Sequence, residues 1–240
     1  MKSTLLILLC VMPLQAIALS EKDIATIDVG GGVPTMLAIE ASVIPLKRLH
    51  LGVGYGLFPG VATGGLAIKL KGGNTATLIN GTFIRLDPHL DHTFSSLSPF
   101  VRYFPNESGF YVQAMLSMFY TKSSFTNNLR TIFGEDIEGG NIYGSINNTI
   151  LMPTLSIGHL LKKDLFFLNV NIGLTYIYDI SSTMELSATI PDSYGGASNN
   201  QSALTKLQNE LGAESTKELN RYREDNKFIP SFTVAIGMYL

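Results

Sequence analysis

The last nine residues, Phe232-Thr-Val-Ala-Ile-Gly-Met-Tyr-Leu240, decide the fold that this sequence predicts. Successive side chains of an extended chain leave opposite faces, so the odd and even positions separate. One face is wholly apolar, and the other is small or polar: Phe232, Val234, Ile236, Met238 and Leu240 against Thr233, Ala235, Gly237 and Tyr239. A soluble strand would need cover for its apolar face, whereas a strand in lipid needs none. We therefore expect this strand to close a barrel whose apolar wall faces a membrane.

The N-terminus predicts export. Lys2 precedes an almost wholly apolar run over Leu5–Met12, and Ala16 and Ala18 follow. A basic start, a short apolar core and an Ala-x-Ala end are typical of a secretory signal peptide. We assign residues 1–20 to this signal and residues 21–240 to one barrel domain. Cys10 lies in the signal, so the mature chain would have no cysteine for a disulfide or a thiolate metal site.

Composition narrows the class of protein. After the signal, no apolar run reaches the roughly 18 residues of a transmembrane helix. The net charge of −2 gives no basic surface for nucleic acid, so no nucleic-acid partner is expected. Only 15% of residues are charged and 23 are glycine. An exported chain of this kind favours an outer-membrane barrel over a periplasmic enzyme, and we expect the outer membrane as its location.

Alternation predicts an all-β fold, a transmembrane antiparallel up-and-down barrel of eight strands. The three tight turns fall at one end and the long connections at the other, as in bacterial barrels. The expected strands cover residues 24–31, 35–44, 49–58, 96–104, 110–120, 149–161, 165–178 and 232–240.

Residues 59–93 allow two interpretations. Leu66–Lys71 alternates and a Gly-Gly turn follows, whereas Thr75–Leu86 alternates poorly. A β-hairpin standing above the membrane in a long loop is preferred, because Thr77–Thr82 offers no continuous lipid-facing row. Two more wall strands, which would make ten, are the alternative.

The two longest connections differ in character. Residues 121–147 are polar and rich in Gly and Asn, and we expect a loop there. Residues 179–226 form the longest predicted loop. Within it, Ser198–Asp225 carries leucines at three- and four-residue spacing among charged residues, which predicts an amphipathic helix, with a break near Gly212. This helix would cap the barrel mouth, or it would dock a partner or contact lipopolysaccharide.

Polar residues on the inward phase are the first candidate site. An eight-stranded barrel is just wide enough for side chains to fill it, and a buried charge must be paired. We expect Arg102 to pair with Glu40, Asp28 or both, while amide side chains complete a hydrogen-bonded plug. The expected members of this lumen network are Asp28, Glu40, Arg102, Gln113, Asn169 and Asn171. A polar path for a small solute is the alternative.

A loop cluster is the second candidate. Asp87, His89, Asp91 and His92 stand close together in the sequence, with Ser95 and Ser96 nearby. Carboxylates and imidazoles at this density can bind a divalent metal, and His with Ser and Asp can support acyl transfer. The spacing shows no triad and no nucleophile motif, so a solvated loop is the simpler interpretation, with no metal, cofactor or catalytic residue assigned.

The pattern and two segments together suggest a family. Ser98-Pro-Phe-Val-Arg-Tyr-Phe-Pro105 and Gly109-Phe-Tyr111, with the alternating terminal strand, resemble small outer-membrane β-barrels of Gram-negative bacteria, the broad OmpA/OmpW-like class. The terminal strand resembles the signal read by the barrel-assembly machinery, which usually ends in Phe, where this chain has Leu240. The resemblance implies contacts with outer-membrane lipid and lipopolysaccharide, and with that machinery during biogenesis.

The predicted function is a non-enzymatic outer-membrane barrel with a side-chain-filled lumen and a structural or surface role. Two alternatives stay open: passive transport of a small or apolar solute, and a lipid-modifying outer-membrane enzyme that uses the loop cluster.

Overall fold

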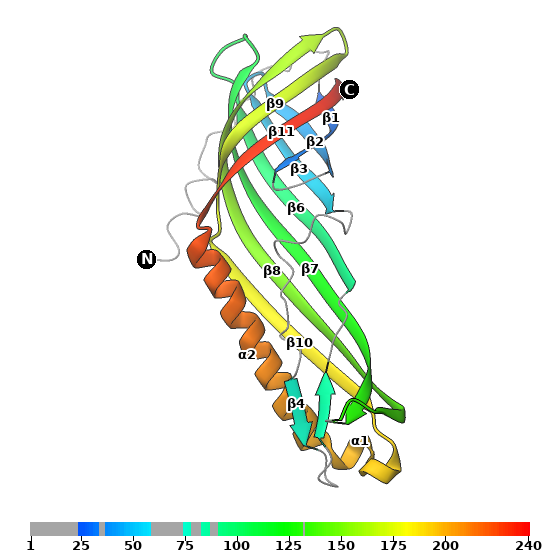
Figure 1. Ribbon diagram of the computed structural model, residues 1–240. Helices are drawn as coiled ribbons and strands as arrows, with labels where there is room; N and C mark the ends of the chain where they lie inside the picture. Colours follow the sequence, from blue (N-terminus) through cyan, green and yellow to red (C-terminus); the bar gives the residue numbers. More distant parts are fainter. Residues whose placement is uncertain (1–23, 34–36, 59–73, 78–82, 87–90, 132) are drawn as a thin grey trace.

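The computed structural model describes residues 24–33, 37–58, 74–77, 83–86, 91–131 and 133–240, so the expected signal over residues 1–20 lies outside it. Within these residues, eight antiparallel strands form a closed ring (Figure 1). In ring order they are β1 (Ala25–Val33), β2 (Leu37–Leu46), β3 (Leu49–Phe58), β6 (Asp91–Tyr103), β7 (Phe110–Thr131), β8 (Asp136–Lys163), β9 (Phe166–Tyr176) and β11 (Phe228–Tyr239). The β1–β11 ladder, from Thr26–Tyr239 to Val33–Phe232, closes the ring. The eight-stranded barrel is confirmed, and its closing strand begins four residues earlier than expected.

The alternating residues of each strand form the two faces of the barrel wall: apolar residues face outward and mostly polar or small residues face the lumen. On β9, for example, Leu168, Ile172 and Leu174 are exposed, whereas Asn169 and Asn171 are buried. Ile236 on β11 remains 67% exposed and Leu155 on β8 64%, although both are large aliphatic residues. Such exposed residues recur on every wall strand, so the outer face of the ring is a continuous apolar belt.

Short connections gather at one end of the ring. The β2–β3 turn is at Lys47 and Arg48, the β6–β7 turn covers residues 104–109, and the β8–β9 turn places Asp164 at φ 55. Asp is one of the few residues that tolerate this left-handed conformation. The chain also ends here, where Leu240 N donates to Ala25 O at 2.9 Å.

At the opposite end, strands β7 and β8 continue beyond the ring. β8 has 28 residues: it pairs with β9 over Thr154–Lys163 and with β10 (Asp179–Thr189) over Asn141–Leu151. The outer parts of β7 and β8 together with β10 form a three-stranded sheet, which we call the arm (Figure 1). The prediction of a loop over residues 121–147 was therefore wrong. The loop predicted over residues 179–226 was wrong in its first part, where residues 179–189 form β10.

The sequence does not predict the strands of the arm, because only one face of the arm is apolar and polar or small residues break up that face. Phe125, Ile142 and Ile146 point to one side, but Asn127 and Gly144 share that side with them. The opposite side carries Ser, Thr and Asn, which resemble loop composition. A strand covered by a helix on one face and by water on the other gives a weaker sequence signal than a lipid-facing strand.

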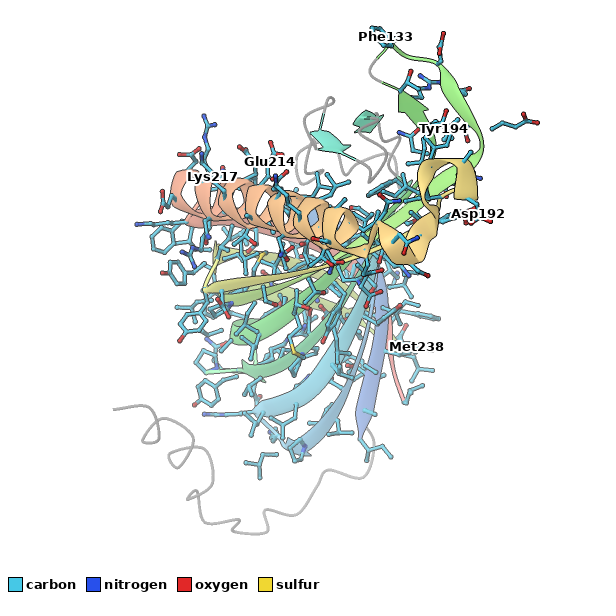
Figure 2. The ribbon with its side chains drawn as sticks, turned by 90° about the horizontal axis from the view of Figure 1, so that it is seen from below. Phe133, Asp192, Tyr194, Glu214, Lys217 and Met238 are labelled. Carbon is cyan, nitrogen blue, oxygen red and sulfur yellow. The ribbon has the colours of Figure 1, made fainter. Side chains whose placement is uncertain are left out.

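Helix α2 (Gln201–Asp225) covers the apolar face of the arm, following the short helices η2 (Asp192–Tyr194) and α1 (Gly196–Asn199) (Figure 1). Glu214 and Lys217 lie on the side of α2 turned away from the sheet (Figure 2). The buried core between helix and sheet comprises Phe125, Leu129, Ile137, Ile142, Ile146, Ile190, Leu204, Leu207, Leu211 and Leu219. The predicted amphipathic helix is confirmed, but it continues through Gly212 without a break.

Strands β4 (Asn74–Thr77) and β5 (Phe83–Leu86) pair with each other outside the ring. β5 also pairs with β7 at Arg130 and Thr131, near the tip of the arm. β4 and β5 add no strand to the ring, so eight wall strands are confirmed over ten within the described residues. The predicted hairpin, which joined Leu66–Lys71 to Thr75–Leu86, stays a prediction because Leu66–Lys71 lies outside those residues. None of the helices in the described part of the chain is long and apolar enough to cross a membrane.

Candidate functional site

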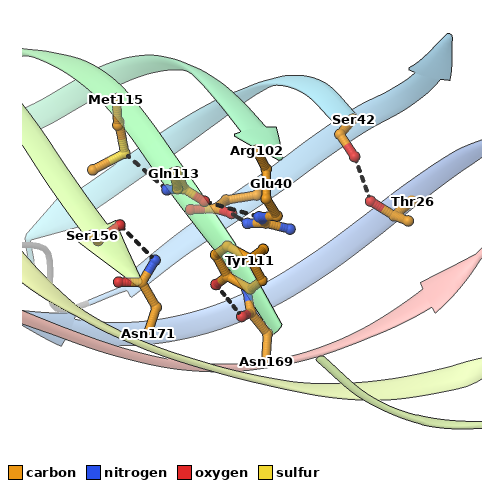
Figure 3. A network of polar contacts seen from close by, with 10 residues as sticks. All are labelled: Thr26, Glu40, Ser42, Arg102, Tyr111, Gln113, Met115, Ser156, Asn169 and Asn171. Atoms are coloured by element: carbon orange, nitrogen blue, oxygen red, sulfur yellow. Dashed lines mark hydrogen bonds and ion pairs between the residues drawn. The ribbon is translucent and has the colours of Figure 1, made fainter. Parts of the chain in front are cut away.

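Six predicted lumen residues converge inside the ring: Asp28, Glu40, Arg102, Gln113, Asn169 and Asn171, the last two from β9. Figure 3 shows all of them except Asp28. Asp28 and Glu40 face each other as direct partners of the β1–β2 ladder. Arg102 and Gln113 are partners in the β6–β7 ladder. Alternation places all these side chains on one face, and closure of the ring turns that face into an interior.

Arg102 is the centre of the network, and its side chain is only 1% exposed. Its Nη2 donates to Glu40 Oε2 at 3.0 Å, and its Nε donates to Gln113 Oε1 at 2.9 Å. The guanidinium also lies 4.6 Å from the centre of the Tyr111 ring and 4.9 Å from that of Phe100. The cation therefore has a carboxylate, an amide and two aromatic faces in place of water, while Asp28 forms no ion pair within the described residues.

Amide and hydroxyl groups extend the network. Tyr111 Oη donates to Asn169 Oδ1 at 2.6 Å, and Asn171 Nδ2 donates to Ser156 Oγ at 3.1 Å. Further toward the arm, Thr154 and Thr175 hydroxyls are 2.7 Å apart. Each such bond stabilises the interior, because an unsatisfied buried polar atom costs about 1–3 kcal/mol. The lumen is therefore a cross-linked plug of side chains. Within the described residues, Asp28 Oδ1 and Arg102 Nη1 are two buried atoms left without a partner.

Aromatic rings fill the lumen near the short turns, and each of three rings lies over a glycine on the next strand. Phe100 faces Gly52, Tyr111 faces Gly158, and Phe167 faces Gly237 in the strand registers. A Cβ at any of these glycines would overlap the ring opposite. Phe104, Tyr111, Leu160 and Phe167 form one buried cluster, to which Tyr239 is added. We call this cluster the aromatic floor.

The end of the lumen next to the arm is closed by a second apolar cluster. It consists of Phe94, Phe119, Ile150, Met152 and Ile177, with Ile180, Tyr222 and Ile229 packed against it. Tyr222 comes from the last turns of α2, and burial raises the pKa of its hydroxyl. We call this second cluster the roof. A cavity of only about 40 Å³ lies below it, lined by serine, threonine and glycine residues and by Glu40, Gln113, Asn169 and Asn171 of the network.

The predicted loop cluster stays a prediction, because only part of it lies within the described residues. Asp87 and His89 lie outside the described residues, whereas the backbones of Asp91 and His92 belong to β6 and pair with Ser124 and Ser123. Within the described residues, no group of three or more metal-ligating side chains gathers. Near the tip of the arm, Asp136 instead pairs with Arg130, with Oδ1 and Nε 2.7 Å apart.

Sequence reasoning missed two parts of the interior. Tyr111 lies on the same phase of its strand as Gln113, but its hydrogen bond to Asn169 joins residues 58 positions apart and has no local sequence signal. The Gly–aromatic pairs were also missed, because they appear only once the strand register is known. Glycines at inward positions opposite an aromatic strand are the one sequence signal that would have suggested them.

Comparisons with known proteins add little. No protein-family model matches the chain, and no curated protein matches it. Among solved structures, Acinetobacter baumannii CarO is 15% identical, with a TM-score of 0.41, 91% of this chain and 98% of that chain covered. CarO2 of the same organism is 15% identical, with a TM-score of 0.40 and the same coverage. A major outer membrane protein from Thermus thermophilus is 14% identical, with a TM-score of 0.41, 90% of this chain and 98% of that chain covered. Likenesses this weak carry no argument about function, and the barrel rests on the strand ladders of this chain.

Proposed function

We propose that this protein is a non-enzymatic β-barrel of the bacterial outer membrane that seals its own lumen and presents the arm outside the cell. The observation that carries the proposal is the combination of an apolar outer belt with a polar, closed interior. In a soluble barrel the belt would be exposed to water, and large exposed apolar areas of this kind mark contacts with lipid or partners.

The dimensions of the wall support a membrane location. β9 has 11 residues, and transmembrane strands need about 9–11 residues when tilted by about 45°. At about 3.3 Å per residue such a strand spans about 25 Å of bilayer, the height of the apolar band in outer-membrane barrels. Outer-membrane lipid and lipopolysaccharide would then contact the belt, and the barrel-assembly machinery would insert the chain, as the OmpA/OmpW-like resemblance implies.

The arm is the part that we propose carries a surface role. Its β7, β8 and β10 strands lead away from the belt, and α2 holds it together through a buried core. The mixed charges of α2, such as Glu214 and Lys217, face away from the sheet (Figure 2). A partner that docks through Ser198–Asp225 would meet this charged face.

Recording from planar bilayers tests the sealed lumen. We expect no steady, large conductance from the wild-type protein, because the aromatic floor and the roof close the lumen from both ends. Removing rings from both ends, in Tyr111→Ala/Phe167→Ala/Phe94→Ala/Phe119→Ala, should raise the conductance, whereas Tyr103→Ala on the outer face should not. A steady, large wild-type conductance would instead favour passive solute transport. Migration as a heat-modifiable band in outer-membrane fractions tests the location independently.

A further inference from the structure

A cavity opens at the end of the barrel with the short turns, and the polar plug does not fill it. Its volume is about 550 Å³, within the range of about 300–1,000 Å³ that is usual for small-ligand pockets. The β2–β3 turn, the β6–β7 turn and the end of β8 supply its rim. We call the open end of this cavity the mouth. In the proposed membrane orientation the mouth faces the periplasm, and this placement is the part of the inference that rests on the proposed function.

The rim of the cavity is basic. Lys47, Arg48 and Lys162 line it, against a single lining carboxylate, Glu107. Lys47 Nζ lies 2.7 Å from Glu107 Oε1, and this hydrogen bond, with the nearby charge of Arg48, holds the pKa of Glu107 below its usual range. The carboxylate is therefore already engaged by Lys47. Within the described residues, Arg48 forms no ion pair of its own.

The inner end of the cavity is aromatic and apolar. Phe104 and Tyr239 of the aromatic floor line it, as do Ile44 and Leu160. His50, 5% exposed, packs its ring against Phe104 with ring centres 4.6 Å apart, and its Nδ1 has no hydrogen-bond partner within the described part of the chain. Lys162 Nζ lies 4.0 Å from the centre of the Tyr239 ring, so a cation is held where rim and aromatic floor meet.

We propose that this mouth is a binding site for an organic anion, a phosphate or carboxylate that carries a compact apolar or ring-shaped body. The Arg48 guanidinium would bind the oxyanion, because its planar fork matches phosphate and carboxylate geometry. The apolar body would enter toward Phe104 and Tyr239. Two sources share this chemistry: the head group of a phospholipid in the adjoining leaflet, and a free organic anion.

Phenyl phosphate is a suitable soluble probe, with benzyl alcohol as its neutral counterpart. The full-length protein in micelles would be titrated while the Ile44 methyl signal is followed, with Ile157 on the outer wall as an internal reference. We expect the Ile44 signal to shift and saturate with phenyl phosphate and to respond weakly to benzyl alcohol. Equal responses to both probes, or none to phenyl phosphate, would overturn the proposal.

A matched pair of lysines provides the control. Lys162 lines the cavity, whereas its neighbour Lys163 does not. Loss of one charged contact typically weakens binding about tenfold, so Arg48→Gln and Lys162→Gln should raise the Kd by about that factor. Lys163→Gln should change it less than about twofold. Equal weakening by all three variants would show a non-specific charge effect and refute the site.

Native mass spectrometry distinguishes the two sources. Wild-type protein from nanodiscs with equal phosphatidylglycerol and phosphatidylcholine would be compared with Arg48→Gln. Selective retention of phosphatidylglycerol by the wild type alone identifies a lipid head group, and phenyl phosphate binding without lipid selectivity identifies a free anion. Heat-modifiable migration of every sample reports the barrel separately, so a failed site is not confused with a failed fold.

Discussion

Replacing Arg102 by methionine tests the lumen network most directly. The substitution removes the charged donor from Glu40 and the donor from Gln113, and it removes the cation between the Phe100 and Tyr111 rings. Glu40, whose side chain is 15% exposed, is then left beside Asp28 with no cation. Removing one partner of a buried ion pair costs about 3–5 kcal/mol, a large share of the roughly 5–15 kcal/mol that holds a typical domain folded.

Equilibrium unfolding by urea in short-chain phosphatidylcholine vesicles, read from the heat-modifiable gel band, would measure this loss. Arg130→Met is the matched control, because Arg130 and Asp136 also pair but are 45% and 54% exposed. An exposed pair contributes only about 0–1 kcal/mol. The double variant Arg102→Met/Glu40→Leu should recover most of the stability, since an apolar pair leaves no unpaired charge. A loss below about 1 kcal/mol in Arg102→Met would refute the network as described.

Three further predictions concern other parts of the molecule. Gly158→Ala should lower the free energy of unfolding by about 1–3 kcal/mol, because the added methyl group overlaps the Tyr111 ring. Gly212→Ala in α2 should be neutral or stabilising. The urea midpoints of the two variants test this difference. Leu211→Ala should cost the arm about 2–5 kcal/mol, seen as faster proteolysis of the arm while the heat-modifiable band persists. Ile172→Arg should cost about 2–4 kcal/mol in lipid and Tyr178→Arg about 0–1 kcal/mol, because only Ile172 lies midway along a wall strand. Equal losses for Ile172→Arg and Tyr178→Arg would contradict the placement of the belt in lipid.

The wall of the barrel could be predicted because each strand meets two contrasting environments. Ile172 and Leu174 alternate with Asn171 and Gly173, and no other fold explains such a row without cover. The sequence also predicted a carboxylate partner for Arg102, since a buried cation in a narrow lumen needs one. It left Glu40 and Asp28 open, and the structure shows Glu40.

The arm could not be predicted in the same way. Ser181, Thr183 and Ser187 on the exposed face of β10 have loop-like composition, and the strand is defined by its ladder to β8 rather than by its own residues. The continuity of α2 through Gly212 likewise depends on packing, because Gln208 Nε2 donates to Met184 O at 2.9 Å and ties the helix to β10. Contacts between residues far apart in the chain, such as these, produce no pattern in the local sequence.

The continuity of β7 and β8 has a mechanical consequence. Their ladder keeps one register from Phe110–His159 to Asn128–Asn141, across the boundary between ring and arm. The part of β8 between Asn141 and Ile150 extends about 30 Å at about 3.3 Å per residue, without a break in the strand at its base. The arm is thus a continuation of the barrel wall and is not attached to it through a flexible linker. A pull at Phe133 on its tip is transmitted as shear to the hydrogen bonds of the wall itself.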